Sequence, residues 1–240
     1  MGRMLWMDDA ELIEQVRALR EKGSSPKAIA RALGLPPVRV APLIKQVAVQ
    51  ASAGRPESDV VECWVSPGWS DGLTVNGHHA WPDVSDPDSS KSGIALALIA
   101  RPSRRGQVTV CGYLVDVYCL GVKNAVGPRK MDDGRGLSDF RRAYFDVYDE
   151  PPLAVPLKLV QHLVFGAVEY SRGLGFEPHP DFAAAAGHLG AWVGPSDIVF
   201  GLDGKPYYME GPYDDSAKVM RTLQRSVGAE GFHFTSSVPF

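Results

Sequence analysis

Cysteine is scarce in this sequence, which contains only Cys63, Cys111 and Cys119. An odd number of cysteines without Cys-x-x-Cys spacing argues against a disulfide framework and against a cysteine-rich zinc site. Runs of about eighteen apolar residues, which a membrane helix needs, are also missing. Because Asp8 and Glu11 interrupt the early apolar stretch, we expect no secretory signal. These absences predict a cytoplasmic protein with reduced thiols and no membrane partner.

The short motifs of several common enzyme classes are missing as well. There is no Gly-x-x-x-x-Gly-Lys-Ser/Thr phosphate loop, no Gly-x-Gly-x-x-Gly after a strand, and no His-Glu-x-x-His pair. No cysteine stands at a recognisable catalytic spacing from a histidine. The missing motifs argue against an enzyme without excluding one, and the sequence names no cofactor.

The clearest pattern lies in residues 1–50, where we expect three short helices. Residues 8–22 place apolar side chains three to four positions apart, as one face of an amphipathic helix requires. A second helix is expected over residues 27–33. A third is expected over residues 37–49, although Pro42 should kink or stop it near the preceding residue.

Residues 25–47 resemble the helix-turn-helix of many bacterial DNA-binding proteins. The matching features are the small Ala30 in the second helix, Gly34 in the turn, and apolar Val40 and Ile44 on the buried side of the third helix. The resemblance implies that the third helix enters the major groove of duplex DNA. We expect base contacts from Arg39, Lys45 and Gln46. We expect phosphate contacts from Lys27 and Arg31. The alternative is that the three helices form a protein-docking or dimerisation module.

Charge is unevenly distributed along the chain, whose formal net charge is −3. Residues 1–50 contain eight basic and five acidic residues, a net charge of +3. The remaining 190 residues contain 17 basic and 23 acidic residues, a net charge of −6. A mildly basic head on an acidic remainder suits a head that contacts phosphate, although a charge of +3 predicts weak, salt-sensitive binding.

The rest of the sequence predicts a second, larger domain. Residues 51–59 are small, polar and interrupted by a proline, which is typical of a linker between domains 1–50 and 60–240. Apolar runs at 93–100 and 108–117 predict an antiparallel hairpin whose two faces are covered by helices. Further elements are expected as a strand at 60–65, a short strand at 73–75, a surface loop at 82–92, helices at 137–148, 157–173 and 182–189, a hairpin of 198–200 with 206–209, and a last helix that Asp214 caps and that ends at Val227. We therefore expect an α+β fold, with a small all-α helix-turn-helix followed by a mixed, mainly antiparallel sheet with packed helices.

Asp116 is the most unusual candidate for chemistry, because it stands inside an apolar run. A carboxylate in such a place needs a partner or a shifted pKa. It could serve as a general base or a metal ligand. Alternatively it caps a helix that begins near Val117, or it pairs with Lys123 or Arg129.

A second group of candidates follows from helical spacing. His162 and Glu169 are seven residues apart and would share a helix face, and His179 and Asp181 follow in the next loop. Together with Asp116 or Cys119 they could hold a metal ion, since histidine, carboxylate and thiolate are common ligands. The alternative is that the histidines only pack or fix a loop. His78 and His79 are expected to be exposed loop residues that chelate poorly, because neighbours in an extended chain point opposite ways.

Three phrases of the larger domain resemble an uncharacterised bacterial protein family: GYLVDVYCLGVKNA (112–125), LVFGAVEYSRGLGFEPHPDF (163–182) and FGLDGKPYYMEGPYDD (200–215). This resemblance implies one intact domain but assigns no activity. Our leading hypothesis is a regulatory DNA-binding protein that forms a homo-oligomer and whose second domain binds a ligand, a partner or itself. The alternatives are a metal-dependent enzyme that acts on nucleic acid and a protein-docking scaffold.

Overall fold

The computed structural model describes residues 9–21, 26–36, 38–44, 47, 62–78, 80–83, 92–103, 106–132 and 134–235. The chain divides into two compact units, Met1–Arg55 (the head) and Pro56–Phe240 (the body). The division falls within the stretch 51–59 that we expected to be a linker, whose residues lie outside the described ones. None of the helices built from described residues has the length and apolar character needed to cross a bilayer.

The head contains α1 (Asp9–Glu21), α2 (Pro26–Leu33) and further helical residues at 38–44. The α2 helix ends at Gly34, which takes a φ of +63°. There the Gly34 N–H donates to the Arg31 carbonyl and the Leu35 N–H donates to the Ala30 carbonyl. This pair of bonds is the Schellman motif, which a glycine adopts without steric cost.

Pro42 does not end the helix. The helical residues at 38–44 continue past it, so of the two outcomes expected near Ala41, a kink or a stop, the stop is wrong. Pro42 follows Val38 by four residues and lies close to the start of the helical stretch. Only the bond to the Val38 carbonyl therefore loses its donor, which a helix tolerates near its first turn.

An antiparallel sheet of five strands forms the centre of the body, in the order β5-β4-β3-β1-β6. These strands are β1 (Glu62–Val65), β3 (Ile94–Pro102), β4 (Gln107–Asp116), β5 (Gly121–Asp132) and β6 (Leu153–Ala154). The hairpin of β3 and β4 confirms the prediction from their apolar runs. The body is therefore α+β with a mainly antiparallel sheet.

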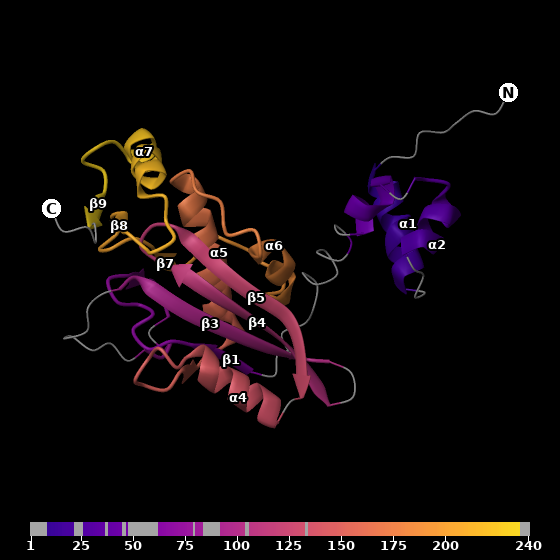
Figure 1. The fold of residues 1–240 in the computed structure, drawn as a ribbon, viewed down its shortest axis with the longest axis horizontal. Coiled ribbons are helices and arrows are strands. Elements are labelled where there is room, and N and C mark those ends of the chain that lie inside the picture. Colours follow the sequence, from indigo (N-terminus) through magenta and orange to yellow (C-terminus); the bar gives the residue numbers. More distant parts are fainter. Residues whose placement is uncertain are drawn as a thin grey trace. The chain divides into compact units, whose positions relative to one another are not determined.

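Helices cover both faces of this sheet, as Figure 1 shows for α4 (Arg135–Tyr144) and α5 (Leu157–Gly173). In β3 the side chains alternate between two cores, because successive residues of a strand point to opposite faces. Ala97 and Ile99 pack in the core that contains α5, whereas Leu98 packs in the core that contains α4. This two-sided burial explains why β3 and β4 read as continuous apolar runs.

The remaining elements pack around this sheet. They are β2 (Thr74–Val75), α6 (Phe182–Ala185), the 3₁₀ helix η2 (Ala186–His188), β7 (Ile198–Val199), β8 (Tyr207–Met209), α7 (Ser216–Val227) and β9 (His233–Thr235). A third apolar cluster joins α7 to the turn after β4 and to the end of α5, through Leu223, Cys119 and Leu174. The α7 helix is thus attached to the end of the sheet where β4 turns into β5 (Figure 1).

The structure differs from the sequence-based expectation at several places in the body; for example, α4 ends at Tyr144 and not at residue 148. The predicted hairpin around Asp203 does not form a ladder, since β7 pairs with β2, β8 pairs with β9, and one isolated bridge joins Leu202 to Lys205. Asp215, not Asp214, caps α7, by accepting the Lys218 N–H at 2.9 Å. The longest strand, β5, was not predicted, because it is an edge strand whose second half is exposed and polar.

Candidate functional site

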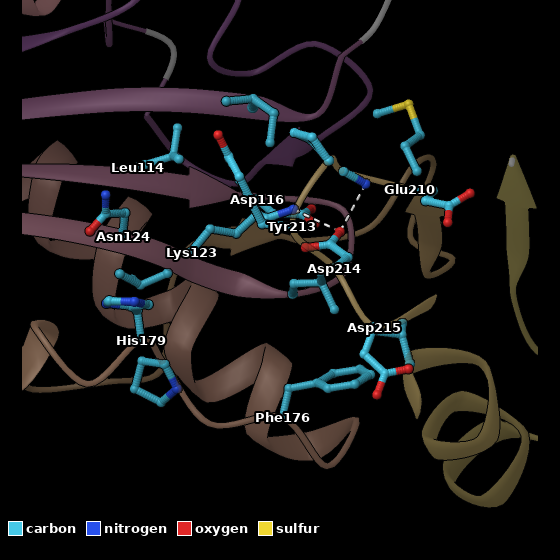
Figure 2. A pocket seen from close by; sticks show the side chains of 18 of the residues that line it. Leu114, Asp116, Lys123, Asn124, Phe176, His179, Glu210, Tyr213, Asp214 and Asp215 are labelled. Carbon is cyan, nitrogen blue, oxygen red and sulfur yellow. Dashed lines mark hydrogen bonds and ion pairs between the residues drawn. The ribbon is translucent and has the colours of Figure 1, made fainter. Parts of the chain in front are cut away.

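A cavity of about 970 Å³ lies at the end of the sheet where β4 turns into β5. Three segments far apart in sequence form its walls: the β4–β5 hairpin with Asp116 and Lys123, the loop after α5 with Phe176 and His179, and the segment that follows β8 (Figure 2). Each of the three phrases that carry the family resemblance supplies one of these walls. A cavity of this size matches those that hold small molecules in other proteins.

Asp116 is buried at the wall of this cavity, with 6% of its surface exposed. Its Oδ1 accepts the backbone N–H groups of Tyr118 and Cys119, each at 2.9 Å. Burial raises the pKa of Asp116 from 3.8 to about 6, against the opposing effect of these hydrogen bonds and of Lys123. The carboxylate therefore caps the β4–β5 turn, and no helix begins at Val117.

Lys123 and Asp214 join two walls of the cavity. The Lys123 Nζ lies 2.9 Å from an Asp214 carboxylate oxygen, and the same oxygen accepts the Gly211 N–H at 2.9 Å (Figure 2). Asp214 thus connects the segment after β8 to Lys123 of β5. Lys123, one of the two cations expected to pair with Asp116, pairs with Asp214 in the structure.

The charged side chains around the cavity are mostly acidic. Five acids and two lysines line it, namely Asp116, Glu177, Glu210, Asp214, Asp215, Lys123 and Lys218. Apolar side chains such as Leu114, Phe176 and Met209 complete the wall. The cavity can therefore favour a positively charged group beside an apolar one, and it disfavours phosphate.

The five candidate metal ligands do not meet in one place. Asp116 and His179 line the cavity, and Asp181 lies near His179, with 3.7 Å between its Oδ2 and the His179 Nδ1. Glu169 accepts the Trp192 indole N–H instead. His162 and Glu169 are two turns apart on α5, about 10 Å along its axis, which is too far to share an ion.

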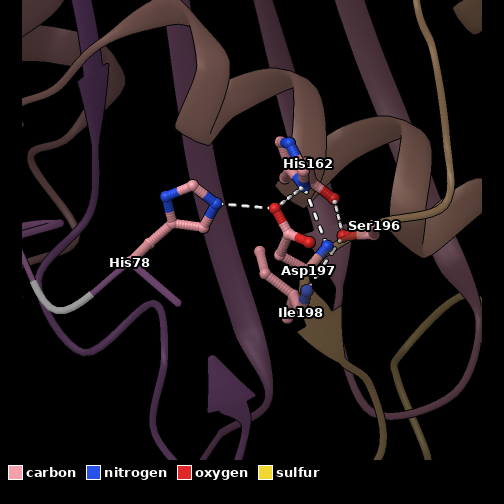
Figure 3. A network of polar contacts seen from close by, with 5 residues as sticks. All are labelled: His78, His162, Ser196, Asp197 and Ile198. Carbon is pink, nitrogen blue, oxygen red and sulfur yellow. Dashed lines mark hydrogen bonds and ion pairs between the residues drawn. The ribbon is translucent and has the colours of Figure 1, made fainter. Parts of the chain in front are cut away.

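His162 instead belongs to a cluster that includes a residue the sequence analysis dismissed. The His78 Nε2 lies 2.6 Å from the Asp197 Oδ2, and the His162 Nδ1 lies 3.6 Å from the same oxygen (Figure 3). The Asp197 N–H also donates to the His162 Nδ1 at 2.9 Å. His78 is half-buried rather than exposed, whereas His79 lies outside the described residues.

Aromatic rings surround these histidines. Trp81 stacks on His78, with ring centroids 4.0 Å apart and planes 4° apart. Trp192 presents an edge-to-face contact to His162 at 5.1 Å. Burial lowers the pKa of His162, while the hydrogen bond from His78 lowers the pKa of Asp197.

A Gly-x-Ser-x-Gly spacing at residues 68–72 was missed by the sequence analysis. In a hydrolase this spacing forms a sharp turn from a strand into a helix, with the serine close to a histidine. Here residues 67–72 form turns between β1 and β2. The Ser70 hydroxyl bonds to the Asp83 carboxylate. The described residues around Ser70 therefore do not form the strand-to-helix turn of a nucleophile elbow.

The head residues that we expected to contact DNA are only partly described. Arg31 in α2 and Arg39 in the helical stretch 38–44 are both exposed. The backbone of Lys27 is part of α2, but its side chain lies outside the described part. Lys45 and Gln46 lie outside the described residues altogether.

Comparison with protein families, with curated proteins and with solved structures finds no match for this chain.

Proposed function

We propose that the chain is a regulatory DNA-binding protein whose head, as a three-helix helix-turn-helix, contacts duplex DNA. The observation that carries this proposal is the single apolar core of the head. Val16 of α1, Ile29 and Ala30 of α2, and Val40 and Val47 beyond them are all buried against one another. A core shared among three helical segments, with a tight turn at Gly34, is what a helix-turn-helix requires.

The charge distribution supports the same assignment. Arg31 and Arg39 remain exposed while their neighbours Ala30 and Val40 are buried, so both cations face away from the apolar core. Exposed arginines can bind phosphates or the edges of guanine. The body carries the excess of acids and its cavity is lined mainly by carboxylates, so DNA is assigned to the head and not to that cavity.

Fluorescence anisotropy of the full chain on random duplex DNA, over a series of salt concentrations, tests this proposal. We expect Arg31→Gln to lower the slope of log K against log salt by about 0.9, the value for one phosphate contact. Arg39→Gln should weaken a selected DNA site by about 1–3 kcal/mol more than random DNA, because a base contact is lost. Arg221→Gln, an exposed arginine of α7, is the matched control and should leave binding unchanged.

Equal affinity and equal salt slope for the wild type and both head variants would contradict the contact assignment. Absence of binding even at low salt would favour the protein-docking alternative for the head.

The body's part in this function is to bind a small ligand. The cavity is large enough for a small molecule and is lined by more carboxylates than lysines beside an apolar wall. We therefore propose a small organic cation with an apolar portion as its ligand.

We also propose self-association, because two DNA-binding heads on two half-sites bind DNA far more tightly than one. Light scattering after gel filtration measures it directly, and a monomeric mass at all concentrations would contradict it.

A further inference from the structure

The geometry points to a divalent transition-metal site formed by His78, His162 and Asp197, and this inference does not depend on DNA binding. Among the described residues, these three form the one group of histidine, cysteine and acidic side chains whose ligand atoms all lie within 4.8 Å of one another. They come from the loop after β2, from α5 and from the residue before β7 (Figure 3). Only the fold brings them together.

The distances suit a metal ion. In a tetrahedral zinc site the ligand atoms stand about 2.0–2.2 Å from the ion, which separates them from one another by about 3.3–3.6 Å. The His162 Nδ1 and the Asp197 Oδ2 are already 3.6 Å apart. The His78 Nε2 lies at hydrogen-bond distance from that oxygen, 2.6 Å, so its ring must withdraw by less than about 1 Å to admit the ion.

One hydrogen bond must be exchanged when the metal binds. The His162 Nδ1 accepts the Asp197 N–H through its lone pair, and a bound metal would use this lone pair instead of the N–H. Because this nitrogen accepts a hydrogen bond, it carries no proton, and the ring can bind a metal through it without first losing one. For His78, the Nε2 proton moves to Nδ1 or leaves, because the metal binds the deprotonated nitrogen.

The surroundings hold the ligands in place. Trp81 lies flat on the His78 ring, and Trp192 contacts the His162 ring by its edge. The Ser196 hydroxyl donates to the His162 carbonyl and accepts the Ile198 N–H, which attaches the Asp197 segment to α5 (Figure 3). Such outer contacts fix ring orientations at metal sites.

The ligand set also indicates the kind of metal. Two imidazoles and one carboxylate, without a thiolate, suit zinc and its neighbours better than calcium or magnesium, which prefer oxygen ligands. The Asp197 side chain is 41% exposed, so solvent reaches the site. Three protein ligands and access for water are the arrangement of zinc sites that keep one position open.

Zinc binding by the full chain tests the inference. After chelator treatment and desalting, the protein competes with a chromophoric zinc indicator. We expect one tight equivalent for the wild type, and at least a tenfold loss of affinity for His78→Gln and for Asp197→Asn. His233→Gln, at an exposed histidine of β9, is the matched control and should bind as the wild type does.

A second measurement needs no substitution, and so remains decisive if a variant fails to fold. Bound Co²⁺ or Ni²⁺ should quench tryptophan fluorescence, because Trp81 and Trp192 contact the two histidine ligands, and zinc should reverse the quenching. Absence of a bound equivalent, or equal binding by His78→Gln, Asp197→Asn and the wild type, would overturn the inference. Quenching that zinc does not reverse would also overturn it.

Discussion

Substitution of Asp116 by asparagine gives the sharpest test of the electrostatics at the cavity wall. In the folded protein burial raises the pKa of this carboxyl from 3.8 to about 6. The folded state therefore holds the proton more tightly than the unfolded state does. The stabilising effect of this proton is complete below pH 4 and is lost as the pH rises through 6.

The size of the pKa shift of Asp116 determines how much the folding free energy changes with pH. A difference of about two pKa units corresponds to about 3 kcal/mol of folding free energy between pH 4 and pH 8. Asparagine keeps the oxygen that accepts the Tyr118 and Cys119 N–H groups but never carries a charge. The carboxylate also accepts the Leu120 N–H, which the amide nitrogen of asparagine cannot do. The loss of this hydrogen bond reduces the expected gain in stability by about 1 kcal/mol. At pH 8 we therefore expect Asp116→Asn to be more stable than the wild type by about 2 kcal/mol.

Urea unfolding between pH 4 and pH 8, followed by tryptophan fluorescence, measures the difference. Four of the five tryptophans lie in the body, so the signal reports mainly its unfolding. Groups that titrate alike in both proteins cancel in the comparison. Asp139→Asn, at an exposed aspartate of α4, is the control and should show no such gain in stability over the wild type at pH 8. A stability difference between Asp116→Asn and the wild type that stays constant with pH would refute the reasoning.

Three further outcomes follow from packing and from the cavity. Gly166→Ala should destabilise the body by about 1–3 kcal/mol in urea unfolding, because its Cβ would lie 2.6 Å from the Ser196 Cβ; Gly173→Ala on the same helix, with open space around it, should be neutral or stabilising. A thiol reagent at pH 8 should label none of the three buried cysteines in the native protein and all three in urea. Burial shields the thiols and also raises the pKa of Cys111 to about 12. Rapid labelling of the native protein would contradict the fold. Small amines, unlike matched carboxylic acids, should raise the melting temperature, and Glu210→Gln should reduce this rise while Glu230→Gln should not. An equal response to amines and acids would count against a cation as the ligand.

Local patterns in the sequence were sufficient for several elements of the fold. The helix at 157–173 was predicted with the bounds that α5 has, because its apolar spacing is strong and a proline precedes it. The β3–β4 hairpin was predicted because both strands are buried on two faces and therefore read as apolar runs. The strand β5 could not be found this way, since an edge strand need not bury its polar residues.

The candidate sites depended on contacts that no local pattern encodes. By itself, the sequence determined which side chains can titrate or bind a metal, and it singled out Asp116 and His162. Only the tertiary structure decided that His162 meets His78 and Asp197, residues 84 and 35 positions away, and not Glu169 two turns along its own helix. The physical reason is that helical spacing determines which residues share a face, whereas the partner of that face is set by how separate segments pack.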